Sequence, residues 1–371
     1  MTWSEWAAAE ATAIRRAGQW RAPRELDAAG PEGKLAPDDR AVVAFASNDY
    51  LGLTQHPAVI AAAHAALDRW GAGSGAARLI VGSRPVHSEL EHDLAGWKRS
   101  ERAVLFPTGF AANLGVLATF GGPDVLVCSD ELNHASIIDG TRLARADVAI
   151  YPHRDLDALD AILSDRADGR RVLVVTDTVF SMDGDLADVD ALVDLCAARD
   201  TLLVLDEAHA VLGPDPDLER LDVLRVGTLS KTLGSLGGFV AGPAALTELI
   251  VNRARPYIFT TAPTPADAAA ALAAVRVVRS PEGDTLRQRL RDNIAILRPG
   301  HPSPIIPVVC GGEERALAAA AALLDQGILV PAIRPPTVAP GTSRLRVALS
   351  AAHAPEQVVT LRDALTGLGL A

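Results

Sequence analysis

The stretch that decides the fold is Thr201-Leu202-Leu203-Val204-Leu205-Asp206-Glu207-Ala208-His209, an apolar run that ends in two acids and a histidine. A short apolar run bounded by polar residues is typical of a strand buried on both faces. A second such run leads into Gly227-Thr228-Leu229-Ser230-Lys231-Thr232-Leu233-Gly234. Polar residues that follow parallel strands meet at one edge of the sheet. We therefore expect Asp206, His209 and Lys231 to lie close together.

Apolar runs of the same kind recur along the chain and alternate with helical patterns. They cover residues 103–106, 125–128, 147–151, 172–176, 201–205, 223–226 and 238–241. The alternation predicts βαβ units and an α/β fold with a mainly parallel central sheet. Beyond about residue 265 the pattern changes to that of a smaller α+β domain. We expect an N-terminal helix and arm over 1–46, a large domain over 47–265 and a small C-terminal domain over 266–371.

The two ends of the chain have their own patterns. An amphipathic helix is predicted up to about Arg24, a loop over 27–40 and a strand over 41–46. In the C-terminal part, helices are predicted over 266–279, 284–297 and 315–326, and strands over 305–309, 328–331 and 344–349. The basic residues of the first segment, Arg15, Arg16, Arg21 and Arg24, fit a patch for a phosphorylated substrate or a solvated helix face equally well.

The composition excludes several classes of protein. The formal net charge of −11 over 371 residues argues against a nucleic-acid partner. The three cysteines are far apart and form no CxxC pair, so neither a metal site nor a disulfide framework is expected. The N-terminus has no apolar signal core, and no apolar stretch is long enough to span a membrane. We expect a cytoplasmic enzyme that binds no membrane.

A lysine, an aspartate and a histidine at neighbouring strand ends are what pyridoxal phosphate (PLP) chemistry requires. The lysine forms a Schiff base, the carboxylate holds the pyridinium nitrogen, and the imidazole reaches a ring substituent. A nicotinamide cofactor is the weaker alternative, because Gly71-Ala72-Gly73-Ser74-Gly75 lacks the third glycine at the right spacing and follows a helical stretch. The motif around Lys231 therefore predicts a PLP enzyme.

Other residues gain meaning only within such a site. Gly109 opens a helical pattern after a strand, which suits a phosphate at a helix N-terminus but is also common in ordinary helices. His134 is either a packed residue or a ring that covers the cofactor. Arg344 and Arg346 share one face of a predicted strand, either as solvated side chains or as a clamp for an amino-acid carboxylate.

An ordered set of motifs resembles the α-oxoamine synthases, a branch of the fold-type I PLP enzymes. The set spans nearly the whole chain and comprises Ser47-Asn48-Asp49-Tyr50-Leu51-Gly52-Leu53, Thr108-Gly109-Phe110-Ala111-Ala112-Asn113, Asn133-His134-Ala135-Ser136, Val179-Phe180-Ser181-Met182-Asp183-Gly184, Asp206-Glu207-Ala208-His209 and Thr228-Leu229-Ser230-Lys231. Any one piece is weak, whereas the ordered set is highly specific. Residues 332–346 resemble those family members that use L-alanine and a pimeloyl thioester.

The resemblance implies a role for each matching residue. Lys231 would hold PLP and move the substrate's α-proton, His134 would stack on the ring, and Asp206 would pair with the ring nitrogen. His209 would contact the ring hydroxyl. The remaining residues implied around the cofactor are Gly109, Phe110, Ser181 and Thr228. Those implied around the substrates are Asn48 and Arg346 for the amino-acid carboxylate, and Arg21 and Thr337 for the acyl group.

The activity implied is a decarboxylative condensation of L-alanine with pimeloyl-CoA or pimeloyl-acyl-carrier protein, as in biotin biosynthesis. The family also implies a homodimer with its sites at the subunit interface. A glycine C-acetyltransferase would share every cofactor residue and differ at residues 335–337. A non-catalytic interaction protein on the same scaffold would bind no PLP, and a nicotinamide dehydrogenase is the distant third alternative.

Overall fold

The computed structural model describes residues 1–166, 170–213 and 215–370. By its internal contacts the chain forms two compact units, each described here by itself. The smaller unit comprises Met1–Ala46, Pro307–Val347 and Val359–Ala371, and the larger comprises Ser47–Ile306 and Ala348–Val358. Residues 266–306 thus group with the larger unit by contacts. The division of the chain at residues 46 and 265 stays a prediction.

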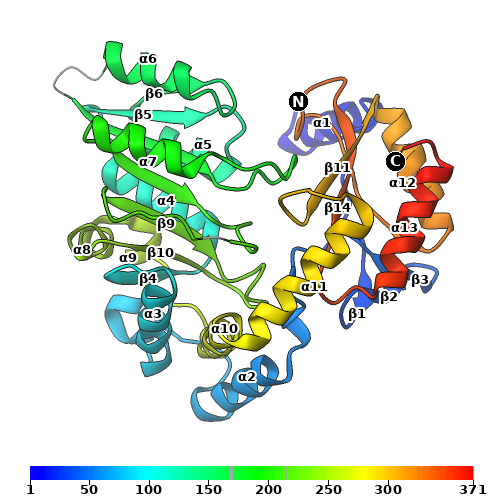
Figure 1. Ribbon diagram of the computed structural model, residues 1–371, viewed down its shortest axis with the longest axis horizontal. Coiled ribbons are helices and arrows are strands. Elements are labelled where there is room, and N and C mark those ends of the chain that lie inside the picture. Colours follow the sequence, from blue (N-terminus) through cyan, green and yellow to red (C-terminus); the bar gives the residue numbers. More distant parts are fainter. Residues whose placement is uncertain (167–169, 214, 371) are drawn as a thin grey trace. The chain divides into compact units, whose positions relative to one another are not determined.

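A seven-stranded sheet forms the centre of the larger unit (Figure 1). Its strands, in spatial order, are β4 (Arg102–Phe106), β10 (Gly238–Gly242), β9 (Val223–Thr228), β8 (Leu202–Asp206), β7 (Arg171–Asp177), β5 (Val125–Asp130) and β6 (Asp147–Tyr151). Only β10 runs antiparallel to its neighbours. All seven strands predicted from apolar runs are present, and the predicted mainly parallel α/β fold is confirmed.

Both faces of this sheet are covered, which is why its strands are apolar throughout. Along β7, Leu173 and Val175 face one hydrophobic cluster while Val172 and Val174 face another. The first cluster is completed by α4 (Gly109–Phe120), α5 (Ala135–Ala144), α8 (Ala244–Arg253) and α9 (Arg255–Ile258). The second is completed by α6 (Leu156–Arg166) and α7 (Val189–Ala198). Continuous apolar runs are the signature expected of such doubly covered parallel strands.

A further layer of the larger unit is built on small side chains. Helix α10 (Pro265–Val278) contacts both α2 (Pro57–Trp70) and α3 (Pro85–Trp97). Its buried alanines, among them Ala268, Ala271 and Ala274, allow these helices to pack closely. Helix α11 (Pro281–Leu297) follows α10, and two single turns complete the unit, η1 (Leu53–Gln55) and η2 (Arg78–Gly82).

The smaller unit contains two small sheets. One has the order β1 (Leu26–Ala28), β2 (Glu32–Leu35), β3 (Arg40–Ala44) and β12 (Ile328–Leu329), and the other has β11 (Ile305–Gly311), β14 (Ser343–Ala348) and β13 (Ala332–Ile333). The helices are α1 (Trp3–Arg16), α12 (Glu313–Asp325) and α13 (Pro355–Gly367). Some of these strands and helices continue across the boundary between the units.

Two predictions for the N-terminal segment are wrong. Helix α1 ends at Arg16 instead of near Arg24, so Arg21 and Arg24 lie outside it. The region predicted as a loop over 27–40 contains β1 and β2, which pair antiparallel. These strands are mostly exposed, with only Leu35 buried, so they lack the alternating burial that a sequence pattern would reveal.

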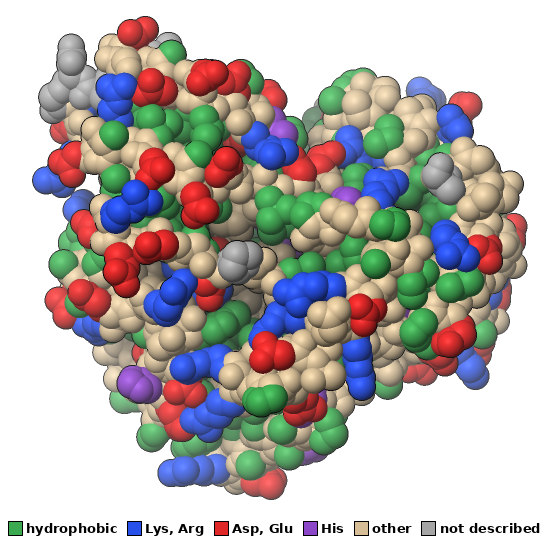
Figure 2. Space-filling model, in the orientation of Figure 1, with side chains coloured by type: hydrophobic (Ala, Val, Ile, Leu, Met, Phe, Trp, Pro, Cys, Tyr) green, Lys and Arg blue, Asp and Glu red, His purple; other side chains and the backbone are tan. Residues whose placement is uncertain are grey.

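The face of the molecule drawn in Figure 2 is of mixed charge. Figure 2 shows acidic and basic side chains interspersed over the face that is drawn, in keeping with a net charge of −11 on a chain that has 35 basic and 46 acidic residues. Within the described part of the chain, no helix combines the length and the apolar character needed to cross a membrane.

Candidate active site

Asp206 lies at the end of β8 and is held by two hydrogen bonds. The side chain of Asn113, on α4, donates to Asp206 Oδ2 at 2.7 Å, and the Ala208 N–H donates to Oδ1 at 2.9 Å. Only 5% of Asp206 is exposed. A buried carboxylate with fixed oxygens is suited to hold a protonated ring nitrogen, which is the role predicted for it.

A second carboxylate, Asp177, stands beside Asp206 on the neighbouring strand β7. Burial raises the pKa of Asp177 well above its usual value, and the negative charge of Asp206 raises it further. Asp177 Oδ2 accepts the backbone N–H of His134 at 2.8 Å. Asp177 therefore serves to fix the start of α5.

His134 caps α5 and faces the same region. The Ser136 N–H donates to His134 Nδ1 at 3.2 Å, and the Ser136 hydroxyl lies 2.8 Å from the same nitrogen. The residue has an exposed edge, but partial desolvation of the ring lowers its pKa, with Asp206 raising and Lys231 lowering it to smaller extents. A neutral imidazole can stack on an aromatic ring and still form hydrogen bonds. Its ring meets the Phe110 ring edge-on, with centroids 6.3 Å apart.

Lys231 lies in the loop that joins β9 to β10, two strands that pair antiparallel. Its Nζ is 2.9 Å from Nε2 of His209, so the structure brings together the residues that the sequence predicted to meet. The loop is closed by the Gly234 N–H, which donates to Lys231 O at 3.0 Å. Gly234 has φ +59°, and a Cβ there would lie 2.5 Å from the backbone nitrogen of Thr54, so only glycine fits.

A cradle for an anion forms between α4 and the end of β9. A Cβ added to Gly109 would lie 3.2 Å from Thr228 Cβ, so the absence of that atom keeps the space between them open. The Thr228 and Ser230 hydroxyls are 2.7 Å apart in the same place. The N-terminus of a helix presents unpaired N–H groups and a positive dipole end to an anion. This cradle suits the phosphate of PLP.

The described residues fit PLP as a whole. They include a lysine, a buried aspartate, a ring to stack and an anion cradle, all carried by the larger unit. Asn113 Oδ1 is a buried acceptor without a partner among them, although Asn113 Nδ2 is satisfied by Ser136 and Asp206. An unsatisfied buried group of this kind is typical of a functional site.

The other predicted residues are more scattered. Ser181 lies in the turn after β7, where Val179 pairs with Leu186. Asn48 belongs to the larger unit, and its Oδ1 accepts from the Tyr50 hydroxyl at 3.0 Å. Arg21, Thr337 and Arg346 belong to the smaller unit, where the first two are exposed and Arg346 is buried. Their contacts with the substrates stay predictions.

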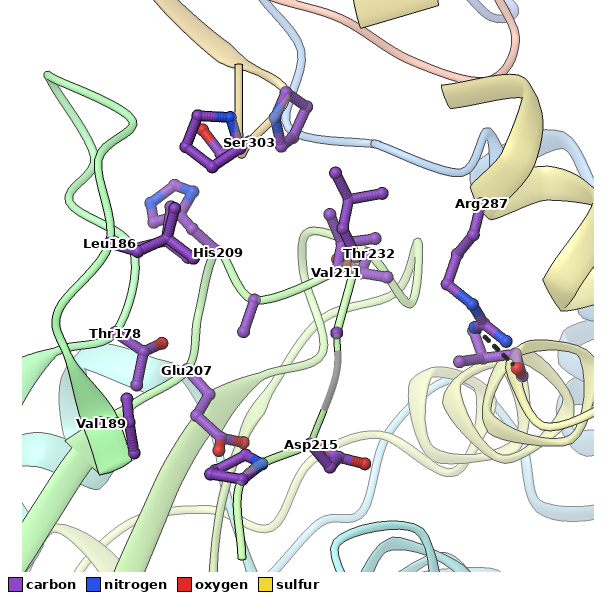
Figure 3. Close-up of a pocket in the computed structure, with 18 of the residues that line it drawn as sticks. Thr178, Leu186, Val189, Glu207, His209, Val211, Asp215, Thr232, Arg287 and Ser303 are labelled. Atoms are coloured by element: carbon purple, nitrogen blue, oxygen red, sulfur yellow. Dashed lines mark hydrogen bonds between the residues drawn. The ribbon is translucent and has the colours of Figure 1, made fainter. Parts of the chain in front are cut away.

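A separate cavity of about 500 Å³ opens behind His209, the only predicted cofactor residue that lines it (Figure 3). In Figure 3, Glu207 and Asp215 lie below His209 and Ser303.

Glu207 belongs to a buried charge network beside this cavity. Successive side chains along an extended segment point to opposite sides, so Glu207 faces away from the cofactor site that Asp206 faces. In that network Lys98 Nζ is 2.8 Å from Glu207 Oε2, and Arg225 bridges Glu207 and Asp215 at 2.6 and 2.8 Å. This network anchors the strand end that carries Asp206.

Three side chains of the site were not predicted, namely Tyr50, Asn113 and Asp177. Tyr50 and Asn113 lie within motifs that were recognised, but no role was assigned to them. The role of Asn113 could have been predicted from the sequence. Its amide lies among the apolar residues of a helix, and a buried amide needs a hydrogen-bond partner. Asp177 had the same signal at the end of an apolar run.

The comparisons with known proteins agree with this geometry. The chain matches the family described as Aminotransferase class I and II over residues 40–365. The 8-amino-7-oxononanoate synthase of Methylobacterium sp. (strain 4-46) is 46% identical over 363 residues, which cover 93% of this chain and 95% of that protein. That of Anaeromyxobacter dehalogenans is 49% identical over 373 residues, which cover 95% of this chain and 93% of that protein. A solved structure of SPT with PLP has a TM-score of 0.90 at 29% identity and covers 98% of each chain.

The fold and the site define a PLP-dependent enzyme of fold type I, as the sequence predicted. The chain belongs to the class I and II aminotransferase family and, within it, to the group of the 8-amino-7-oxononanoate synthases. The predicted cofactor, PLP, and the predicted resemblance to the α-oxoamine synthases are both confirmed.

Proposed function

We propose that this protein condenses L-alanine with a pimeloyl thioester, giving 8-amino-7-oxononanoate, carbon dioxide and a thiol, as a step of biotin synthesis. The observation that carries the proposal is the 2.9 Å contact between Lys231 Nζ and His209 Nε2, beside the buried Asp206. The chain that holds this contact is up to 49% identical to 8-amino-7-oxononanoate synthases. The same reaction was expected from residues 332–346, and the comparisons support it.

PLP, when bound, supplies an electron sink for negative charge at the α-carbon of the amino acid. Lys231 Nζ would hold the cofactor and then take and return the α-proton at that nitrogen. Asp206, oriented by the Asn113 and Ala208 donors, would pair with the ring nitrogen. His134 would cover the ring face, and Gly109, Phe110, Ser181 and Thr228 would surround the rest of the cofactor, with the phosphate at the helix α4 cradle.

The substrate assignments form the finer part of the proposal. Asn48 and Arg346 would bind the alanine carboxylate, for which a guanidinium offers a bidentate partner. Arg21 and Thr337 would contact the acyl substrate, carried by CoA or by an acyl-carrier protein. The active form would be a cytoplasmic homodimer. Exposed apolar residues of the larger unit, among them Ile80 (74%) and Phe259 (70%), support a partner surface.

Thiol release is the direct test of this function. We expect release with L-alanine and pimeloyl-CoA, and little with glycine and acetyl-CoA. The opposite preference would identify a glycine C-acetyltransferase instead. A purified protein that binds no PLP would contradict both and favour a non-catalytic protein on this scaffold.

The attachment of the cofactor has its own test. Borohydride reduction of the holoenzyme followed by peptide mass mapping should place the cofactor mass on Lys231. A holoenzyme whose Lys231 stays unmodified would remove the central residue of the proposal.

A further inference from the structure

We propose that Ser136 is a positioning residue of the active site, whose hydroxyl holds His134 neutral with its single ring proton on Nε2. The inference rests on the proposed function, because it concerns the ring that would cover the cofactor. The motif that contains Ser136 was recognised in the sequence, but neither the motif nor the comparisons assign a role to its side chain.

Ser136 lies in the middle of a chain of hydrogen bonds that runs from Asp206 to His134. Asn113 Nδ2 is 2.7 Å from Asp206 Oδ2 and 2.8 Å from the Ser136 hydroxyl. The same hydroxyl is 2.8 Å from His134 Nδ1. Ser136 is 1% exposed and Asn113 is 2% exposed, so solvent has little access to these contacts. Lys231 takes no part in the chain, so its attachment to PLP breaks none of them.

The number of hydrogens along this chain determines which nitrogen of His134 is protonated. The role proposed for Asp206 requires a carboxylate, which only accepts, so the nitrogen of the Asn113 amide must face it. The two hydrogens of that nitrogen are then both used, one by Asp206 and one by the Ser136 oxygen. The single hydroxyl hydrogen of Ser136 is left for His134 Nδ1, which therefore accepts.

The backbone of Ser136 leads to the same conclusion independently. Its N–H also donates to His134 Nδ1, at 3.2 Å, so this nitrogen accepts two hydrogen bonds and has no room for a proton. A proton on Nδ1 would leave both donors of the buried Ser136 without a partner, which is costly in free energy. The ring of His134 is therefore neutral, with its proton on Nε2.

The electrostatic surroundings of His134 favour the same neutral form. The residue caps the N-terminus of α5, where the positive end of the helix dipole disfavours a second positive charge. Burial lowers the pKa of His134, and this outweighs the opposing effect of the Asp206 charge. Two other titratable groups face the residue. They are Lys231, whose contribution to the pKa is smaller still, and Asp177, which accepts the His134 N–H.

A neutral His134 with its proton on Nε2 has a defined part in the proposed reaction. Nε2 has no hydrogen-bond partner among the residues that the structure describes, so its N–H is available to an oxygen of the substrate. Nδ1, the basic nitrogen, is occupied by Ser136 and cannot take a proton from the substrate. Ser136 therefore makes His134 a hydrogen-bond donor and leaves the α-proton to Lys231.

The test compares Ser136→Ala with Ser129→Ala in the full-length holoenzyme. Ser129 is also buried and also accepts from an asparagine amide, Asn133 Nδ2 at 2.9 Å, so its variant is the matched control. Nitrogen-15 NMR of histidine-labelled protein, assigned by His134→Gln, should show the wild-type His134 proton on Nε2 at neutral pH. The midpoint of the His134 titration should move to higher pH in Ser136→Ala, because the neutral ring loses a donor to Nδ1, and should stay in place in Ser129→Ala.

Kinetics across the pH range provide a second measurement. On the acidic side of the profile, kcat/KM for L-alanine should fall by roughly two- to tenfold in Ser136→Ala alone, the loss expected for one hydrogen bond. Both variants should retain bound PLP.

Several outcomes would overturn the proposal. They are a wild-type His134 protonated on Nδ1 at neutral pH, a His134 titration that Ser136→Ala leaves unchanged, and equal changes in both serine variants. The wild-type spectrum decides the matter even where Ser136→Ala does not fold. The proposed function fails separately, through a wild type that releases no thiol from pimeloyl-CoA with alanine.

Discussion

Asp177 and Asp206 stand side by side at the ends of β7 and β8, in register as nearest neighbours across the two strands. Two carboxylates this close do not both ionise readily. The pKa of Asp177 is raised well above its usual value, first by burial and then by the negative charge of Asp206, and this favours a neutral Asp177. The structure thus divides two identical side chains into different roles by their surroundings.

Because the two carboxylates have different roles, replacing each by asparagine should affect the activity to very different extents. Asp206→Asn removes the charge that holds the ring nitrogen, so kcat should fall by about 10²–10³-fold. Asp177→Asn replaces a protonated carboxyl by a similar amide that can still accept the His134 N–H, so kcat should change far less. Steady-state kinetics of both variants, with PLP content measured in parallel, provide the comparison. Equal losses would show that Asp177 is charged in the working enzyme.

The predicted stacking by His134 can be separated from its hydrogen bonding. His134→Phe keeps a ring over the cofactor but loses the nitrogens, while His134→Ala loses both. Aromatic stacking contributes about 0.5–1.5 kcal/mol, so PLP affinity should fall by up to about tenfold in the alanine variant and little in the phenylalanine variant. The activity should fall in both. Titration of the apoprotein with PLP measures the first effect, and a weaker affinity in His134→Phe than in His134→Ala would exclude stacking.

His153 joins the end of β5 to the turn that carries Ser181, and this contact should depend on pH. Its Nδ1 is 3.0 Å from Asp130 and its Nε2 is 2.8 Å from Asp185. Burial lowers the pKa of His153, but the hydrogen bonds to Asp130 and Asp185 outweigh it, so the net shift is upward. A pKa raised on folding contributes stability that is complete below the unfolded value of about 6.5 and is lost as the pH rises through the folded value.

The Tm of His153→Gln should therefore lie furthest below that of the wild type in mildly acidic buffer, and the gap should narrow above neutral pH. Thermal unfolding across this range measures the difference. His64→Gln, on the exposed face of α2, is the control and should show no such dependence. A difference in Tm between wild type and His153→Gln that grows with rising pH would contradict the upward shift of the His153 pKa.

Thr232 offers a test of stability next to the cofactor lysine. Its hydroxyl is buried and has no hydrogen-bond partner among residues 1–166, 170–213 and 215–370. Thr232→Val keeps the shape and removes an unsatisfied polar group, so the free energy of unfolding should stay constant or rise by about 1 kcal/mol. The matched variant Thr178→Val removes a hydroxyl that donates to Asp206 O at 3.0 Å, and it should lower that free energy by about 1 kcal/mol. Denaturant titrations that show Thr232→Val to be the more damaging change would point to an unrecognised partner of that hydroxyl.

The sequence predicted the central sheet well because burial on both faces leaves a direct trace in it. Strands such as β7 and β8 are apolar throughout and end in polar residues, so both their position and the residues at their ends could be read. The exposed strands β1 and β2 leave no such trace, since they are held by strand pairing, β1 to β2 and β2 to β3, and not by an apolar face. The early end of α1 was missed for a related reason, because the helix has no buried residue to mark its extent.

The residues of the candidate active site also fall into those that the sequence predicted and those that it did not. Lys231, Asp206 and His209 follow strands of one sheet, so the topology alone predicted that they would meet. The contact between Tyr50 and His209 joins segments 159 residues apart, and nothing local in either segment specifies the other. Asn113 was placed in a motif, but its bond to Asp206 depends on how α4 packs on the sheet. Long-range partners of this kind require the packed structure.

The return of residues 348–358 to the larger unit affects how the enzyme is made. All cofactor residues, from Gly109 to Lys231, leave the ribosome long before Ala351, yet the backbone beside Tyr50 is held by Ala351 and Ser350. Asn293 fixes that late segment by donating to Ser350 O and His353 O, both at 3.0 Å. A nascent chain that stops after residue 306 would contain the whole PLP site but lack the segment that braces Tyr50. The backbone around Tyr50 therefore receives its last hydrogen-bond partners only in nearly the final part of synthesis.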